Sequence, residues 1–280
     1  MDKLGLGIVA FDDTLHLKNI ITEIRDLCDV VTVCLQNVSY HGDPIDDKII
    51  VEIEKLKEEK LVDKIIWFEA SNEYDASLPE TPRAIETDKR NYILDSLQDD
   101  GCTYAIVIDS DEFYDHDDFK KAKDIVFNDP NVSISYCQYI NYYRDYNHVM
   151  VWPFLCYVPF ITDIKYRFDF KNGSFDKPSD PTRRYKIEDS GVKFCIFNWD
   201  VVKMHHLSWI RKNAEDKVKN WSAKKYFDKI EGLYEDILDR YYNYKDGQNA
   251  IIMFNVPNYE VVVNRLPAQY IHPKYNLLDL

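Results

Sequence analysis

Two aspartates follow an apolar run near the middle of the chain. Residues 104–114 read YAIVIDSDEFY, so Asp109 and Asp111 lie two positions apart. A short apolar run rich in β-branched residues is typical of a buried parallel strand, and ligands of open α/β sheets bind just beyond the carboxyl ends of such strands. Residues i and i+2 of a strand point to the same side. Both carboxylates can therefore face one hard divalent cation, which prefers oxygen ligands and often bridges to substrate phosphates.

A second role for acids at this place is capping of the next helix, because an aspartate accepts hydrogen bonds from free backbone N–H groups. Asp115, Asp117 and Asp118 follow closely and are better placed for that role. The sequence therefore predicts a metal or phosphate site at Asp109 and Asp111, with capping left to the later acids.

Three other segments carry side chains that suit such a site. The run 88–91 (DKRN) offers a cationic fork and an amide that could hold a base or a diphosphate. His205 and His206 end a strand-like run; neutral imidazole binds Mn²⁺-type ions, but adjacent strand residues point opposite ways, so at most one faces a given metal. The acids of the irregular region, Glu188 and Asp189 among them, could supply a general base. Each segment also has a structural alternative. Residues 88–91 could be a helix surface, a histidine could belong to the core, and the acids could lie in a solvated turn.

The charge balance limits the partners. The net charge is −14, which disfavours nonspecific binding to nucleic acid or anionic membrane. Between Lys203 and Lys225, however, seven Lys or Arg residues stand against two acids. This basic segment could bind phosphate or form a solvated helix face.

Six scattered cysteines without a C-x-x-C pair indicate reduced thiols, not a disulfide framework or a zinc site. We find no basic-then-apolar leader at the N-terminus and no apolar stretch near the ~20 residues of a membrane span. The expected location is the cytoplasm, without a membrane span.

Several nucleotide and hydrolase signatures are missing. Only Gly5-x-Gly7 stands where G-x-G-x-x-G would follow the first strand, and neither G-x-x-x-x-G-K-[ST] nor G-x-S-x-G occurs. A dinucleotide-dependent hydride transfer is therefore poorly supported, and a P-loop NTPase is excluded.

The spacing of apolar residues predicts the elements that position these side chains. Strands and helices alternate over the first 145 residues, which implies a mostly parallel sheet with right-handed crossovers. The predicted strands are 4–11, 30–35, 65–69 and 105–108, and the predicted helices are 15–27, 49–61, 83–97 and 117–127. Thereafter we expect a long strand at 132–143, loops and short antiparallel strands over 144–193, strands at 192–198 and 201–207, and helices over 211–244.

Taken in order, these segments resemble the GT-A glycosyltransferases, especially the family 2-like branch. The matching pieces are the first strand at 7–11 (GIVAF), the Lys89-Arg90-Asn91 helix, the D-x-D motif at 106–112 (IVIDSDE) and the late histidine segment at 205–209 (HHLSW). The resemblance covers about residues 4 to 211.

The resemblance implies an α/β, GT-A-like (Rossmann-like) fold in a single domain, 1–280. Residues 1–145 would be its nucleotide-sugar-binding half, and 146–280 would hold the irregular, antiparallel acceptor half and the C-terminal helices. The enzyme would transfer a hexosyl or pentosyl group from a nucleotide-diphosphate sugar, with a UDP-sugar as the expected donor, to a hydroxyl acceptor.

Asp109 and Asp111 would then hold Mn²⁺ or Mg²⁺ against the diphosphate, which stabilises the charge on the leaving group. The late metal ligand would be His206, with His205 as the alternative. The remaining contacts implied are Phe11, Arg90 and Asn91 to the nucleotide, Ser110 near its ribose, and Arg211 or Lys212 to the leaving diphosphate.

Inverting members of the family carry a carboxylate base in an E-D motif at the start of a helix. Glu188-Asp189 stands beside Gly191 without a clear helix, so a retaining mechanism stays open. Trp152 and Tyr157 are candidate acceptor platforms by residue type.

The acceptor could be a surface glycan, a lipid-linked saccharide, a protein or a hydroxylated DNA base. The acidic chain makes DNA less favoured, while the basic segment keeps it open. Two other functions are alternatives. One is a nucleotidyltransferase, which would usually show a Gly-rich phosphate loop where residues 11–14 read FDDT, and the other is a non-catalytic carbohydrate-binding module.

Overall fold

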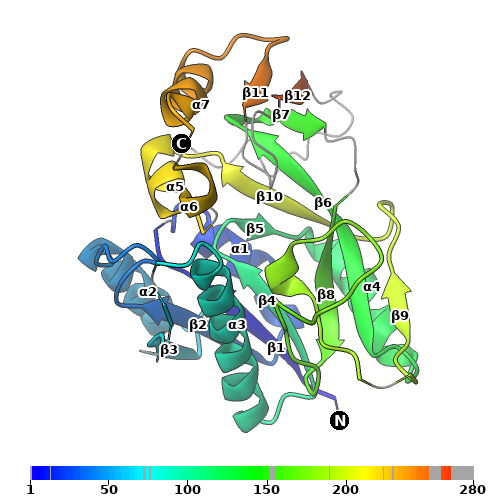
Figure 1. The fold of residues 1–280 in the computed structure, drawn as a ribbon. Coiled ribbons are helices and arrows are strands. Elements are labelled where there is room, and N and C mark those ends of the chain that lie inside the picture. Colours follow the sequence, from blue (N-terminus) through cyan, green and yellow to red (C-terminus); the bar gives the residue numbers. More distant parts are fainter. Residues whose placement is uncertain are drawn as a thin grey trace. The chain divides into compact units, whose positions relative to one another are not determined.

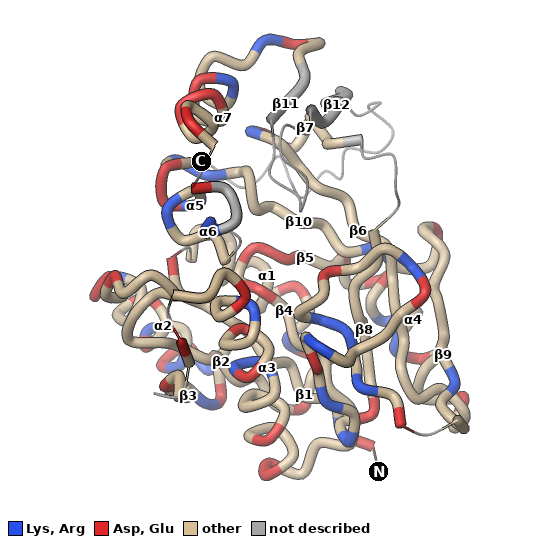
Figure 2. The backbone as a smooth tube through the Cα atoms, in the orientation of Figure 1, with Lys and Arg blue, Asp and Glu red and all other residues tan. Residues whose placement is uncertain are grey.

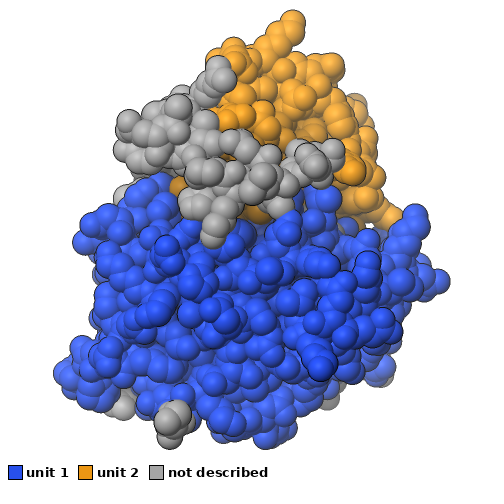
Figure 3. Space-filling view, turned by 180° about the vertical axis from the view of Figure 1, so that it is seen from behind, with its two compact units in different colours: residues 1–139, 155–204 blue, residues 140–154, 205–280 orange. Residues whose placement is uncertain are grey.

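The computed structural model describes residues 2–12, 14–71, 74–75, 77–151, 156–188, 190–222, 224–228, 230–251 and 260–265. They belong to two compact units, coloured separately in Figure 3. Unit 1 contains residues 1–139 and 155–204, and unit 2 contains residues 140–154 and 205–280. These units do not divide the chain at residue 145, because the stretch 155–204 groups with the first 139 residues. The single domain stays a prediction.

Four parallel strands form the first part of unit 1 (Figure 1). They are β1 (Leu4–Val9), β2 (Val30–Gln36), β3 (Lys64–Phe68) and β4 (Tyr104–Asp109), in the order β3-β2-β1-β4. Every residue of β1 is buried, as expected for a strand covered on both faces. The four predicted strands are confirmed to within a few residues at each end.

Antiparallel pairing extends this sheet beyond β4. Strand β8 (Tyr157–Asp163) pairs antiparallel with β4 and with β6 (Ile134–Tyr143), and β9 (Phe194–Ile196) pairs parallel with β6. A two-residue strand, β5 (Glu112–Phe113), follows the D-x-D motif and was not predicted.

The helices of unit 1 follow the predicted periodicity. They are α1 (Leu17–Ile24), the 3-10 turn η1 (Arg25–Leu27), α2 (Asp47–Glu58), α3 (Thr81–Asp99), α4 (His116–Asn128) and the 3-10 turn η2 (Pro181–Arg183). Asp115 caps α4 by accepting hydrogen bonds from the N–H groups of Asp117 and Asp118, at 3.0 and 3.3 Å. Among the three later acids, Asp115 is therefore the cap.

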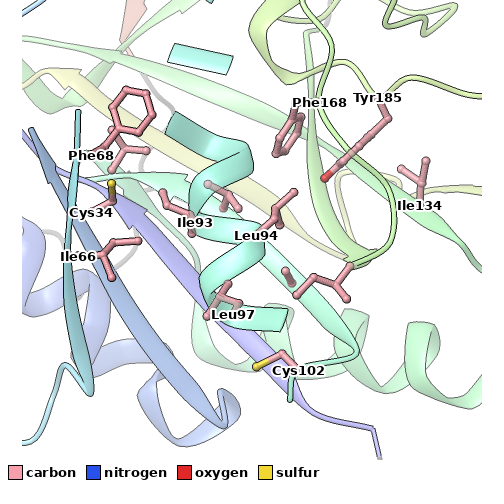
Figure 4. Packing of buried hydrophobic residues seen from close by; sticks show 14 of the residues in the cluster. Cys34, Ile66, Phe68, Ile93, Leu94, Leu97, Cys102, Ile134, Phe168 and Tyr185 are labelled. Atoms are coloured by element: carbon pink, nitrogen blue, oxygen red, sulfur yellow. The ribbon is translucent and has the colours of Figure 1, made fainter. Parts of the chain in front are cut away.

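Helix α3 packs closely on the sheet through a cluster of buried residues (Figure 4). Ile93 and Leu97 are fully buried there. A Cβ at Gly7 of β1 would lie 2.1 Å from Ile93 Cγ2, so only glycine allows α3 to come this near. The same helix carries Lys89 and Arg90, and its close packing fixes where these two residues lie.

Unit 2 is antiparallel and helical. The chain enters it within β6 and, later, within β10 (Lys203–Trp209). Strands β7 (Asp145–Val151), β12 (Glu260–Arg265) and β11 (Asn249–Ile251) extend from β6 in that order, all antiparallel. The helices are α5 (Ala214–Asn220), α6 (Lys224–Phe227) and α7 (Leu233–Tyr242). Trp209, Ile237 and Tyr241 lie in their shared core.

The predicted fold class is confirmed: an α/β protein with a mostly parallel sheet flanked by helices, followed by antiparallel strands and C-terminal helices. All six cysteines are free thiols. Among the described helices, none combines the length and apolar composition that a membrane span requires.

Candidate functional site

The carboxyl ends of the parallel strands in unit 1 meet a row of charged side chains from α3. Asp109 is the last residue of β4, and Gln36 is the last residue of β2. Helix α3 contributes Glu86, Lys89 and Arg90. This edge is where ligands bind in open α/β sheets, and it is where the sequence predicted the site.

The Asp109 carboxylate is held by two arginines. Arg90 Nη2 donates to its Oδ1 at 2.9 Å and to its Oδ2 at 3.1 Å, and Arg183 Nη2 donates to Oδ2 at 2.6 Å. Burial acts to raise the pKa of Asp109, but the two guanidinium groups outweigh it and hold the pKa well below its usual range. Asp109 is therefore ionised throughout the physiological pH range.

Arg183 also forms a two-bond ion pair with Glu112. Nη1 donates to Oε2 at 2.9 Å and Nη2 donates to Oε1 at 2.5 Å. The two side chains are 5% and 2% exposed. Glu112 Oε2 in turn accepts the backbone N–H of Asp109 at 3.1 Å. Arg183 thus ties the segment that contains η2 to the end of β4.

Arg90 is completely buried and keeps free donors beside Asp109. Its Nη2 bonds Glu86 at 2.8 Å as well as Asp109, whereas Nε and Nη1 are buried without a hydrogen-bond partner. An unsatisfied buried donor costs free energy, and such groups in a native protein usually mark a missing partner. An acceptor on a bound ligand would satisfy them.

Lys89 gives this edge a second buried cation. It is 2% exposed, donates to Gln36 Oε1 at 3.1 Å and stands 4.9 Å from the centre of the Tyr40 ring. Burial lowers the pKa of Lys89 from its ordinary value. Its contacts join α3 to the end of β2 and the loop that follows.

The charges of this cluster favour a cation. Four carboxylates and two guanidinium groups give the cluster a net charge of −2, or −1 when Lys89 is also charged. These groups are Glu86, Asp109, Asp111, Glu112, Arg90 and Arg183. Within the part of the chain that the structure describes, no group of three His, Cys, Asp or Glu residues could enclose a metal ion. Mg²⁺ usually needs no such cage, because one or two carboxylates hold it together with substrate phosphates. Asp109 and Asp111 fit a cation shared in that way.

The predicted nucleotide contacts have different surroundings. Phe11 is half-buried in the bend after β1, and the N–H of the buried Ser110 donates to the Val9 carbonyl at 3.1 Å. Asn91, in contrast, uses its amide to hold the backbone of Phe168, with Nδ2···O and N···Oδ1 distances both 2.9 Å. Arg90 and Ser110 therefore lie next to the aspartates, while Asn91 anchors the segment after β8.

The late histidines belong to unit 2. His205 is buried, with Nδ1 2.9 Å from the Tyr142 hydroxyl, and His206 is half-buried, with Nδ1 2.5 Å from Asn141 Oδ1. Their different partners agree with the expected alternation along a strand. Which of them binds a metal stays a prediction.

The predicted diphosphate contacts also lie in unit 2. Arg211 Nε donates to the Ser208 carbonyl at 2.7 Å, and Lys212 is exposed. The surrounding basic segment includes acidic residues, as Figure 2 shows for α5, whose first turn is acidic and whose last turn is basic. That arrangement complements the helix dipole. The contacts of Arg211 and Lys212 with a diphosphate stay predictions.

Two of the predicted base and acceptor residues, Glu188 and Tyr157, have partners outside the arginine network. Glu188 is 75% exposed and pairs with Lys186 at 2.5 Å. Tyr157, half-buried in β8, accepts a hydrogen bond from Gln138 Nε2 at 3.0 Å. Asp189 and Trp152 lie outside the described residues.

Arg183 is the site residue that sequence reasoning missed. It lies within residues 144–193, for which the sequence predicts only loops and short antiparallel strands. An arginine in a loop is exposed in most proteins. The sole signal was a pair of neighbouring arginines within a segment of little periodicity, and this does not indicate which one is buried.

No protein family matches the sequence, and no curated protein matches it either. Two solved structures from S. aureus are similar to this chain, both at 11% sequence identity. One is TarS, with a TM-score of 0.40, where the match covers 86% of this chain and 43% of TarS. The other is TarS 1-349, with a TM-score of 0.41, where it covers 87% of this chain and 72% of that one. The chain thus spans less than half of the longer TarS.

Proposed function

We propose that the protein is a glycosyltransferase that uses a divalent cation and a nucleotide-diphosphate sugar. The observation that carries the proposal is the acidic end of β4, where Asp109 and Asp111 lie at the carboxyl edge of the parallel sheet beside the buried Arg90. This combination supplies oxygen ligands for a cation and buried donors for an anionic ligand at one place.

Each residue of this site would have its own role in binding. Asp111 and Asp109 hold Mn²⁺ or Mg²⁺, which when bound offsets negative charge on a diphosphate. Arg90 turns its two unpartnered donors to oxygens of the nucleotide, and Ser110 contacts the ribose. Glu112 holds the Asp109 N–H, so the two aspartates keep their spacing when the ligand arrives.

The proposed donor is a UDP-sugar. Binding of GDP, CDP and TDP is to be compared with binding of UDP. Sugar transfer to a saccharide hydroxyl is the reaction proposed, with Tyr157 and Trp152 as acceptor contacts. His206 is the proposed late metal ligand, with His205 as its alternative. Arg211 and Lys212 are proposed contacts of the leaving diphosphate. The catalytic base is sought at Asp189 first, because Glu188 is exposed and paired with Lys186.

Release of nucleoside diphosphate tests the proposal directly. Purified protein is incubated with UDP-glucose, UDP-galactose, UDP-N-acetylglucosamine and UDP-xylose, with Mn²⁺ or EDTA, and free UDP is measured. Even without an acceptor, a glycosyltransferase of this kind should hydrolyse its donor slowly. We expect Mn²⁺-dependent release from one donor, lost in Asp111→Asn. No release and no binding for any nucleotide would reject the proposal.

A DNA acceptor has its own test. Phosphate contacts make binding to DNA fall steeply with salt. Transfer that is unchanged between low and moderate salt would exclude it.

A further inference from the structure

Two positively charged groups converge on one oxygen of Asp109. Oδ2 accepts from Arg183 Nη2 at 2.6 Å and from Arg90 Nη2 at 3.1 Å. The Asp109 side chain is 30% exposed, whereas those of Arg183 and Arg90 are 5% and 0% exposed. A cation arriving from solvent can therefore reach this carboxylate, but it meets an oxygen that a guanidinium group already holds.

We propose that Arg183 and a divalent cation compete for the Asp109 carboxylate, so that Arg183 sets the cation affinity of the site. The inference rests on the proposed function, because it takes Asp109 and Asp111 as the cation's ligands. Like charges a few ångströms apart repel strongly where water is scarce. A cation on Oδ2 and a guanidinium at 2.6 Å from the same atom therefore exclude each other.

The surroundings of Arg183 allow the exchange without leaving a buried charge unpaired. When Arg183 no longer donates to Asp109, it keeps its two hydrogen bonds to Glu112, which are 2.9 and 2.5 Å long in this structure. Arg90 likewise keeps Glu86 at 2.8 Å. Removing the partner of a buried charge would be strongly destabilising, and this arrangement avoids that cost.

The backbone around Arg183 is fixed by contacts that do not use its guanidinium group. Asp180 Oδ1 accepts from the N–H of Thr182 at 2.8 Å, and the Arg184 carbonyl accepts from the N–H of Asp169 at 2.9 Å. The exchange therefore involves the side chain of Arg183 and leaves η2 in place. Arg183 is therefore a positioning residue for the cation site and does not contact the substrate.

Cation affinity measured without nucleotide tests the inference. Mn²⁺ binding is measured by calorimetry and by the electron paramagnetic resonance of free Mn²⁺, on wild type, Arg183→Lys and Arg184→Lys. Lysine keeps the positive charge next to Glu112 but cannot bridge two carboxylates as the planar guanidinium does. Arg184 is the matched control, because its side chain bonds Ser179 and not the aspartates.

We expect Arg183→Lys to tighten Mn²⁺ binding by about fivefold or more, within the usual range of coupling between two ligands, and Arg184→Lys to leave it unchanged. Equal or weaker binding in Arg183→Lys would overturn the competition while leaving the aspartates as ligands. No Mn²⁺ binding in any of the three proteins would overturn the competition, and donor turnover in EDTA would overturn the metal dependence as well.

A second measurement uses wild-type protein, in case Arg183→Lys does not fold. The ¹⁵Nε signal of Arg183 is followed by NMR during a titration with Mg²⁺. The signal should shift as the guanidinium group leaves Asp109, while that of Arg184 stays constant. An unchanged Arg183 signal at saturating Mg²⁺ would overturn the proposal.

Discussion

Arg183 and Glu112 are 71 positions apart in the chain and form a buried ion pair with two hydrogen bonds. The pair joins η2, in the irregular segment, to β5, directly after the aspartates. Because Glu112 also accepts the N–H of Asp109, the spacing of the site depends on a contact between distant parts of unit 1.

Glu112→Gln should lower the free energy of unfolding by about 3–5 kcal/mol, the usual cost of leaving one partner of a buried ion pair without its charge. Urea denaturation measures this loss. Glu188→Gln is the matched control: its ion pair with Lys186 is exposed, so its effect should stay within about 0.5 kcal/mol. Equal effects of the two substitutions would contradict a structural role for the Arg183–Glu112 pair.

Asp109 should make stability depend on pH in acid. Its folded pKa lies below the ordinary aspartate value of about 3.9, so the unfolded state binds the proton more readily. The stabilisation is fully present above that value and is lost as the pH falls toward the folded pKa. Wild type should therefore lose stability below about pH 4 more steeply than Asp109→Asn.

Unfolding curves in urea from pH 2.5 to pH 7 measure this difference. The gap in stability between wild type and Asp109→Asn should be widest at neutral pH and should narrow in acid. A gap that stays constant across the range would show that the two arginines do not depress the pKa of Asp109.

Gly7→Ala tests the close approach of α3 to β1. The added Cβ would overlap Ile93 Cγ2, and overpacking of a core usually costs about 1–3 kcal/mol. The double variant Gly7→Ala/Ile93→Ala removes the overlapping atom and should lose less stability than the sum of the two single variants. Additive losses would mean that the two residues do not meet.

Asn91→Ala separates anchoring from nucleotide binding. The substitution removes both hydrogen bonds to the Phe168 backbone, and we expect a loss of about 1–3 kcal/mol in stability. Nucleotide affinity, measured by calorimetry, should stay within about twofold, since the amide is engaged with Phe168. Asn128→Ala, on the exposed end of α4, should change neither. A large loss of nucleotide affinity at unchanged stability would instead support the prediction that Asn91 contacts the nucleotide.

The strands and helices of the first 145 residues could be read from the sequence because local periodicity specifies them. Leu17, Ile20, Ile21 and Ile24 repeat at helical spacing and are all buried in α1. The cap of α4, Asp115, was among the three acids predicted for that role, because capping depends on a few adjacent residues. The place of Asp109 followed from a general rule about strand ends.

The irregular region was predicted only in outline, as loops and short antiparallel strands, because its strand pairing depends on distant partners. The seven-residue strand β8 pairs with β4 between residues that are 57 and 59 positions apart (Ala105 with Thr162 and Tyr104 with Asp163), and the sequence of β8 does not indicate that partner. Strand β5 is only two residues long, too short for any period to appear. The burial of Arg183 depends on Asp109 and Glu112, and a charged side chain buried by its partners has no local signature. The resemblance placed Asn91 at the nucleotide, and its contact with Phe168, 77 positions away, has no local signal in the sequence.

We propose that the aspartates after β4 hold a nucleotide through a divalent cation. Calorimetric titration of UDP, with Mn²⁺ or EDTA, tests it most directly on wild type and Asp111→Asn. Asp124→Asn is the control, since Asp124 is exposed and pairs with Lys120 on α4. We expect UDP binding to require Mn²⁺, to weaken by at least about tenfold, or 1.4 kcal/mol, in Asp111→Asn and to be unchanged in Asp124→Asn. Binding that is equal in all three proteins, or indifferent to Mn²⁺, would contradict it.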